Sequence, residues 1–348
     1  MVSINMISSA VKVKGQGVGS AYIEQVRLVN EGLGSGYKVY ENKPVLADIM
    51  HYHTIDLKHF FIAPFARMKG VNVGYVHFLP ETIEGSLDLP APVKKIFYKY
   101  IIAFYKSMDY LVAVNPYFIK KLAEFGIDSK RIAYIPNFVS GNFFRCMSSG
   151  EKNELRKKYG IGESDFVVLG VGQVQTRKGV GDFINTAELL KDVKFLWAGG
   201  FSFGRITSGY KTLKGVVDSP PPNVKFMGIV EREHMNEIYN IADVLFLPSY
   251  NELFPMAILE AFACGIPVLL RDLDIYPDVF FDYYIKGNTG SDFAAAVDRL
   301  KNDREYYSFC KAQAYKGHEY YCEENILSMW REFYSKVSKK INLAEDFL

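Results

Sequence analysis

The stretch Asp243–Leu270 reads DVLFLPSYNELFPMAILEAFACGIPVLL and contains one strand–helix–strand unit. Apolar runs at Asp243–Pro248 and Pro267–Leu270 predict two buried strands, and the periodic run Pro255–Cys264 predicts the helix between them. Its initial proline suits a first helical turn, and the glycine that follows, Gly265, suits a C-terminal cap. Strands joined by a helix predict a parallel sheet of the α/β class.

The same alternation extends outward from this unit in both directions. In the second half, strands are expected at Phe166–Val174, Val193–Ala198 and Val224–Val230, and helices at Val180–Leu190 and Glu231–Ile241. The first half is less regular, with strands expected at Ser3–Ser8, Asp48–His53, Val71–His77, Tyr110–Val114 and Ile132–Pro136. We therefore predict two doubly wound, Rossmann-like α/β domains facing a central cleft. They span residues 1–148 and 149–323, and a final helix in 324–348 can pack back on the first domain.

Composition narrows the class of protein. The chain has 348 residues, 49% of them hydrophobic, and a formal net charge of +2, which argues against a protein that coats nucleic acid. Residues 1–150 carry 17 Lys and Arg against 11 Asp and Glu, whereas residues 151–348 carry 24 against 28. The basic half is expected to meet an anionic surface, the alternative being ordinary scatter of charge. Four cysteines without metal or redox spacing favour a reducing cytosol, and no apolar run is long enough to span a bilayer.

Two glutamates eight positions apart are the strongest chemical signal. Glu252 falls in the loop before the predicted helix, and Glu260 falls inside the helix. A carboxylate can accept hydrogen bonds from adjacent sugar hydroxyls, and the helix N-terminus between the two can face a phosphate. The alternative is a solvent-facing glutamate pair.

Two glycine-containing loops carry cations next to a predicted strand end. In Gly172–Gly179 (GQVQTRKG), Arg177 and Lys178 stand before a glycine at a helix start, an arrangement suited to clamping a diphosphate. The alternative is a basic surface turn. In Lys14–Ser20 (KGQGVGS), the glycines Gly15, Gly17 and Gly19 let backbone N–H groups approach an anion, although a plain strand–helix turn looks the same.

With these motifs the sequence resembles the retaining glycosyltransferases of family 4, which have the two-domain GT-B fold. The match is Glu252, seven residues, Glu260, and then Gly265-Ile266-Pro267. The resemblance implies that Glu260 holds the ribose of the donor nucleotide and that Glu252 contacts the donor sugar. It implies that Arg177 and Lys178 bind the leaving diphosphate and that the Gly15–Gly19 loop approaches the phosphates from the other domain.

The histidines and two departures complete this comparison. The resemblance places His77, after the predicted strand Val71–His77, near the transferred sugar, and His53 ends another strand. Leu253 stands where the family usually has glycine, and Arg271–Asp274 replaces a glycine pair, so the identity of the sugar stays open. Neither the histidines nor the Asp272-Leu273-Asp274 loop predicts a metal site, and no cofactor is implied beyond a UDP-sugar as donor substrate.

Two segments of the basic half combine lysines with aromatic residues, at Leu57–Lys69 and Pro92–Tyr110. They predict helices lying on an anionic membrane surface, or else core helices with solvated lysines. Residues 5–10, 13–22 and 74–83 look like the glycolipid synthases of Gram-positive bacteria. That resemblance implies hexosyl transfer from UDP-galactose or UDP-glucose to α-glucosyl-diacylglycerol, by a peripheral protein on the inner face of the cell membrane. The diglycosyl lipids formed also anchor lipoteichoic acid.

Three other functions fit the same motifs. The acceptor could be a soluble sugar or polysaccharide instead of a glycolipid. A non-catalytic partner subunit would bind the nucleotide sugar without transferring it, and the replacement of the usual glycine by Leu253 is the only support for that reading. A sugar-nucleotide epimerase of the same fold would convert the donor without an acceptor.

Overall fold

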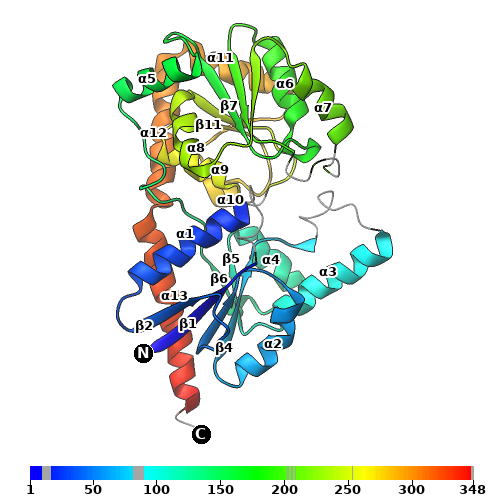
Figure 1. Ribbon diagram of the computed structural model, residues 1–348, viewed down its shortest axis with the longest axis vertical. Coiled ribbons are helices and arrows are strands. Elements are labelled where there is room, and N and C mark those ends of the chain that lie inside the picture. The colour runs from blue at the N-terminus through cyan, green and yellow to red at the C-terminus, as the bar shows by residue number, and fades with distance from the viewer. Residues whose placement is uncertain are drawn as a thin grey trace. The chain divides into compact units, whose positions relative to one another are not determined.

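The computed structural model describes residues 1–9, 17–80, 90–201, 204, 207, 209–252 and 254–345. It divides into two compact units (Figure 1). Unit 1 combines Met1–Phe138 with Glu323–Leu348, and unit 2 is Val139–Cys322. Each unit contains one parallel sheet with helices, so the prediction of two doubly wound α/β domains is confirmed.

The sheet of unit 1 has the strand order β2-β1-β3-β4-β5-β6 with every neighbouring pair parallel. Its strands are β1 (Val2–Ile7), β2 (Tyr37–Glu41), β3 (Ile49–Tyr52), β4 (Val71–Val76), β5 (Tyr110–Ala113) and β6 (Ile132–Tyr134). Its helices are α1 (Gly17–Gly32), α2 (Leu57–Arg67), α3 (Ala91–Lys106), α4 (Pro116–Glu124) and α13 (Glu323–Glu345).

The sheet of unit 2 has the order β12-β11-β10-β7-β8-β9, again all parallel. Its strands are β7 (Val167–Val171), β8 (Lys194–Ala198), β9 (Val224–Gly228), β10 (Val244–Leu247), β11 (Val268–Arg271) and β12 (Ile285–Gly287). Its helices are α5 (Ser149–Tyr159), α6 (Val180–Leu189), α7 (Tyr210–Asp218), α8 (Arg232–Ile241), α9 (Met256–Ala263), α10 (Pro277–Phe280), α11 (Gly290–Asn302) and α12 (Arg304–Tyr320).

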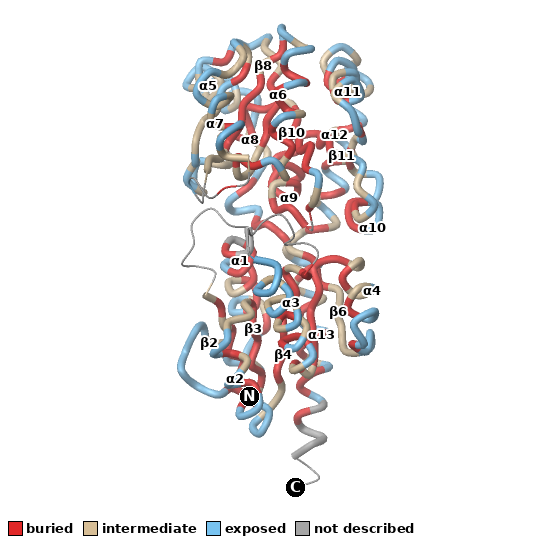
Figure 2. The backbone as a smooth tube through the Cα atoms, turned by 90° about the vertical axis from the view of Figure 1, so that its right-hand side faces the viewer, coloured by how far each residue is buried: buried red, intermediate tan, exposed pale blue. Residues whose placement is uncertain are grey.

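Two strands were not predicted, and both lie at a sheet edge. β2 mixes exposed and half-buried residues, and β12 has only three residues. β2 (YKVYE) alternates charged and apolar residues and β12 (IKG) offers a single large apolar residue, so neither contains the continuous apolar run by which the other strands were recognised. Figure 2 shows the central strands of each unit as buried.

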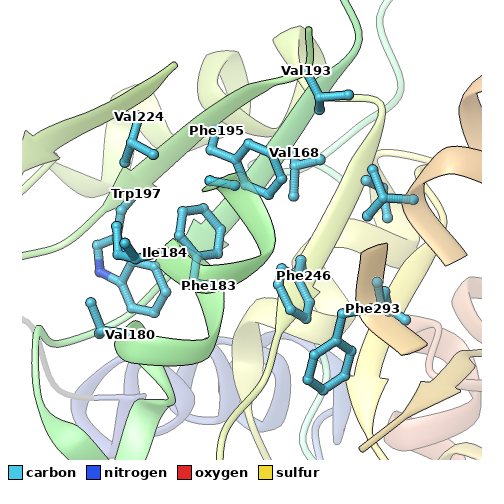
Figure 3. Close-up of a cluster of buried hydrophobic side chains, with 14 of the residues drawn as sticks. Val168, Val180, Phe183, Ile184, Val193, Phe195, Trp197, Val224, Phe246 and Phe293 are labelled. Atoms are coloured by element: carbon cyan, nitrogen blue, oxygen red, sulfur yellow. The ribbon is translucent and has the colours of Figure 1, made fainter. Parts of the chain in front are cut away.

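Aromatic side chains organise the core of unit 2 around Phe183 of α6 (Figure 3). Its ring packs edge-to-face on Phe195 at 5.3 Å and on Trp197 at 5.0 Å, and it stacks on Phe246 at 5.7 Å. A Cβ at Gly170 would lie 2.3 Å from the Trp197 ring, so glycine is required in the middle of β7. This packing fixes β7 and β10 side by side, and the loops that follow them carry the candidate site.

The boundary between the units lies at Phe138/Val139, ten residues before the predicted 148. Phe144 packs edge-to-face on Tyr239 of α8 at 5.8 Å, and the Met147 backbone N–H donates to Asn240 Oδ1 at 2.8 Å. These contacts attach residues 139–148 to unit 2. The polar composition at the end of this segment is typical of a linker, which is why the predicted boundary lies later.

The last helix, α13, packs within unit 1. Trp330 stacks on Tyr75 at a centroid distance of 5.9 Å, and the Tyr334 hydroxyl lies 2.7 Å from His51 Nδ1. Arg331 also donates two hydrogen bonds to the carbonyl oxygen of Gly32 at the end of α1. The last segment of the chain thereby completes the core of the first domain.

Helix ends differ from the predictions in small ways. Helix α9 begins one residue later than expected, so Pro255 is its N-cap, whereas Gly265 follows its C-cap with φ +66° as expected. Helix α1 begins at Gly17, so Gly17 and Gly19, which were predicted to lie in a loop, are helical. Glycine disfavours a helix interior but costs little in the first turn, which is why the glycines pointed to a loop. Gly15 lies outside the described residues.

Candidate functional site

The turn after β7 places two cations beside the end of β10. Arg177 and Lys178 lie in a single 3-10 turn, Thr176–Lys178, which ends at Gly179 in the left-handed region with φ +68°. A Cβ on Gly179 would lie 2.2 Å from the carbonyl oxygen of Pro248. Only glycine allows both this backbone conformation and this approach, so the turn is held directly against the loop that carries Glu252.

Glu252 lies between these two cations. Its Oε1 pairs with Lys178 Nζ, and its Oε2 lies 3.5 Å from Arg177 Nη1. The same Nη1 donates to the carbonyl oxygen of Asn251 at 2.5 Å, and the Tyr250 N–H donates to the carbonyl oxygen of Arg177 at 2.9 Å. The clamp cations and the sugar-contacting carboxylate predicted separately from the sequence thus form one cluster within unit 2.

Glu252 is ionised in this cluster. Its side chain is only 8% exposed, and burial alone would raise the pKa of its carboxyl group. The charges of Lys178 and Arg177 outweigh burial, so the pKa lies below its ordinary value. The alternative of a solvent-facing glutamate pair is wrong for Glu252, and equally for Glu260, which is 7% exposed.

Tyr276, which the sequence analysis did not single out, lies in the field of this cluster. Its side chain is fully buried, and in the part of the chain that the structure describes neither its hydroxyl nor Arg177 Nε has a hydrogen-bond partner. Burial, and next the charge of Glu252, raise the pKa of Tyr276 well above its ordinary value. The Tyr276 hydroxyl therefore stays neutral, and a hydrogen-bond donor is held near the Glu252 carboxylate. The only signal in the sequence was its place just after the unusual loop Arg271–Asp274.

Glu260 is held by a different set of side chains. The Tyr239 hydroxyl donates to Glu260 Oε2 at 2.6 Å, and Arg232 Nη1 lies 3.9 Å from Oε1. The Arg232 guanidinium in turn lies over the rings of Phe143 and Phe144, at 5.8 and 5.5 Å. Helix α8 therefore orients the carboxylate that helix α9 carries.

Arg271 supports the loop of Glu252 from the neighbouring strand. Its Nε donates to the carbonyl oxygen of Pro248 at 3.0 Å, its Nη2 pairs with Asp182, and its guanidinium lies 4.1 Å from the Tyr250 ring centroid. Arg271, the first residue of the segment Arg271–Asp274, thus holds the loop of Glu252 in place. Asp272 pairs with Lys286 at 3.4 Å, and Leu253 lies outside the described residues.

His77 lies in unit 1, directly after β4, and His53 lies directly after the neighbouring strand β3. Their ring centroids are 6.0 Å apart, and the ring of Tyr75 lies 4.3 Å from His77 and 4.9 Å from His53. Burial lowers the pKa of His77 to about 3, so its imidazole is neutral at pH 7. The carboxyl ends of strands are where open α/β sheets bind ligands, which is consistent with the predicted place of His77.

Two features are absent from the residues that the structure describes. Within them, no three His, Cys, Asp or Glu side chains are grouped so that they could hold a metal ion. In the same ranges no helix is both long enough and apolar enough to cross a membrane.

Comparisons with known proteins identify the family. The profile of the family described as "Glycosyl transferases group 1" matches residues 151–317. Over 96% of this chain and 89% of the relative, the sequence is 43% identical to the alpha-galactosylglucosyldiacylglycerol synthase of Streptococcus pneumoniae. It is 26% identical to the processive diacylglycerol alpha-glucosyltransferase of Acholeplasma laidlawii, over 84% of this chain and 85% of the relative.

Solved structures share the fold. Anabaena HepE in complex with UDP-glucose superposes with a TM-score of 0.76 at 14% identity, covering 97% of this chain and all of that one. Sucrose-phosphate synthase from Thermosynechococcus elongatus gives a TM-score of 0.76 at 15% identity, covering 98% and 100%. The resemblances found in the sequence are confirmed: the chain belongs to the group 1 glycosyl transferases, in the family of the pneumococcal alpha-galactosylglucosyldiacylglycerol synthase.

Proposed function

We propose that this protein transfers a hexose from UDP-galactose or UDP-glucose to α-glucosyl-diacylglycerol, with retention at the anomeric carbon. The product is a diglycosyl-diacylglycerol, and we propose that it also serves as a lipoteichoic acid anchor. The observation that carries the proposal is 43% identity over 96% of the chain to a protein named as a synthase of such a lipid. The buried cluster of two cations and a carboxylate supports it, because a nucleoside diphosphate sugar offers both a diphosphate and hydroxyls.

The leaving group determines what the cations do. Breaking the anomeric C–O bond puts negative charge on the diphosphate and oxocarbenium character on the sugar. Arg177 and Lys178 stabilise the first charge, Glu252 accepts hydrogen bonds from sugar hydroxyls, and Glu260 accepts them from the ribose. We assign a supporting role on the phosphates to Gly15, Gly17 and Gly19, at the start of α1 and just before it.

His77 suits a sugar-positioning role because its imidazole is neutral. A cation there would repel the oxocarbenium-like sugar, whereas a neutral ring can hydrogen-bond a hydroxyl. For retention we propose attack from the leaving-group face, with a diphosphate oxygen taking the acceptor's proton. This route requires no metal and no carboxylate nucleophile.

We further propose that helices α2 and α3 bind an anionic membrane surface. The two helices are neighbours within unit 1 (Figure 1). They pack against each other through Phe60, whose ring lies 5.7 Å from that of Tyr100. Away from that contact, α2 and the residue after it expose large apolar side chains, and so does the start of α3. These are Leu57, Phe61, Ile62, Phe65, Met68, Val93 and Ile96.

The charges of the same two helices have one sign. Their sequences, LKHFFIAPFAR and APVKKIFYKYIIAFYK, contain six Lys and Arg and no Asp or Glu. Exposed aromatic and aliphatic side chains among lysines fit the boundary of an anionic leaflet, where each basic residue contributes about 1 kcal/mol. This location, on the inner face of the membrane, brings the protein to a lipid acceptor.

Sedimentation with vesicles tests the membrane proposal. We expect binding to vesicles containing phosphatidylglycerol, weaker binding at high salt, and at least a tenfold loss in the double variant Phe61→Ser/Phe65→Ser. Phe309→Ser, which removes an exposed phenylalanine from unit 2, is the matched control. Equal binding of all three proteins would contradict the proposal.

Transfer itself is tested with labelled UDP-galactose or UDP-glucose and vesicles containing α-glucosyl-diacylglycerol. A labelled diglycosyl lipid from one donor is the expected result and identifies the sugar. Transfer to soluble sugars without lipid would favour the soluble-acceptor alternative. UDP binding without any transfer would favour a non-catalytic subunit, and conversion of the donor without an acceptor would indicate an epimerase.

A further inference from the structure

We propose that Glu252 competes with the donor diphosphate for Lys178 and Arg177, and that this exchange makes the site discriminate a UDP-sugar from free UDP. The inference rests on the proposed function, because it assigns the diphosphate to these two cations. It goes beyond that function by giving Glu252 a second role, against the product nucleotide.

The contacts of Glu252 require the exchange. Its carboxylate uses one oxygen on Lys178 Nζ and has the other 3.5 Å from Arg177 Nη1, so it occupies positions that phosphate oxygens need. All three side chains are largely buried, with 8% exposure for Glu252, 15% for Lys178 and 25% for Arg177. Water therefore screens their interaction little, and each anion weakens the attraction for the other.

The parts that can rearrange are the lysine and the glutamate. Arg177 is held at its backbone by the Tyr250 N–H and at its side chain by the carbonyl oxygen of Asn251. By contrast, the stem of Lys178 crosses Gly172, where a Cβ would lie only 3.3 Å from Lys178 Cε. The absence of a side chain at Gly172 leaves the lysine room to turn toward a phosphate.

The consequence differs between a sugar nucleotide and a free nucleotide. When a diphosphate takes the cations, Glu252 becomes a buried carboxylate without its partners, which is unfavourable. A bound hexose restores hydrogen bonds to that carboxylate through its hydroxyls, whereas UDP alone does not. Free UDP therefore binds more weakly than its diphosphate contacts would allow, which helps release it after transfer.

Isothermal titration calorimetry on the full chain tests this exchange. In Glu252→Gln we expect UDP and inorganic pyrophosphate to bind about tenfold more tightly, and uridine, which has no phosphate, to bind unchanged. The affinity for UDP-hexose rises less, because the glutamine amide is a weaker acceptor for the sugar hydroxyls than the Glu252 carboxylate. The preference for UDP-hexose over UDP therefore falls. In a Lys178→Gln background the gain for pyrophosphate shrinks below about threefold, because the contested lysine is gone.

Glu237→Gln is the matched control, since Glu237 is also a unit 2 glutamate in an ion pair, with Lys158 at 2.7 Å. It should change none of these affinities. Unchanged or weaker UDP binding in Glu252→Gln overturns the inference while leaving the proposed function intact, whereas a wild-type protein that does not bind UDP overturns the proposed function. If Glu252→Gln fails to fold, Lys178→Gln alone decides: a loss of pyrophosphate affinity under about threefold supports the exchange, and any larger loss contradicts it.

Discussion

Acid should destabilise unit 1 through its buried histidines. His51 is buried against Tyr75, Trp330 and Tyr334, and His77 is buried against Tyr75. Burial lowers the pKa of each histidine to about 3, for His51 with a further contribution from the charge of His77. In an unfolded chain a histidine has a pKa of about 6.5. Between these two values the unfolded chain binds protons that the folded chain excludes, so stability falls as the pH falls below about 6.5.

The size of the effect follows from this pKa difference. Between pH 7 and pH 5, each of the two histidines lowers the free energy of unfolding by about 2 kcal/mol, or about 4 kcal/mol for the pair. His53 adds to the effect, because its pKa is also lowered well below the ordinary value. A loss of this size is a large fraction of the stability of a typical domain.

The two tryptophans allow unit 1 to be followed separately, since Trp330 lies in unit 1 and Trp197 in unit 2. In a Trp197→Phe background, urea unfolding monitored by Trp330 fluorescence should show a loss of at least about 4 kcal/mol from pH 7 to pH 5. His51→Phe should remove about 2 kcal/mol of that pH dependence, whereas His234→Gln, at an exposed site in unit 2, should remove none. A stability that changes by less than about 1 kcal/mol, or a His51→Phe variant with the full pH dependence, would refute the reasoning.

Three other predictions concern unit 2. Arg271→Ala removes the cationic partner of Asp182 and should lower the free energy of unfolding by about 3 kcal/mol in urea titrations followed at Trp197 in a Trp330→Phe background, with Arg271→Lys restoring less than half. Glu260→Gln should weaken UDP about tenfold in calorimetry but 2′-deoxy-UDP less, and an equal loss for both would argue against a ribose contact. Transfer of hexose should continue at an undiminished rate in excess EDTA, and a loss that Mg²⁺ or Mn²⁺ restores would contradict the metal-independent route.

Much of the site could be predicted because its parts are local patterns. A strand, a glycine-bounded turn and a cation pair within it are adjacent in the chain, as are Glu252, the helix N-terminus and Glu260. The sequence could not show that Glu252 pairs with Lys178, 74 positions earlier. That pairing arises because β7 and β10 are neighbours in the sheet, which brings the loops at their carboxyl ends together.

Other residues of the site and of the core could not be identified from the sequence for a similar reason. Tyr239 comes from α8, Arg271 ends β11, and Tyr276 follows it, and each matters through a partner distant in the chain. Likewise, the spacing of Trp330 and Tyr334 predicts only that they share one face of a terminal helix, whereas in the structure they pack in the core of the first domain. Strands β2 and β12 escaped detection because neither contains a continuous apolar run.

By itself, then, the sequence determined the α/β class, most central strands, the family and the residue types of the candidate site. These are encoded in the period of apolar residues and in short spacings, which act within a few residues. Only the tertiary structure decided which charges neutralise each other and which histidines are excluded from water. Both depend on strand order and on the packing of segments far apart in the chain, and burial then sets the protonation of the groups so brought together.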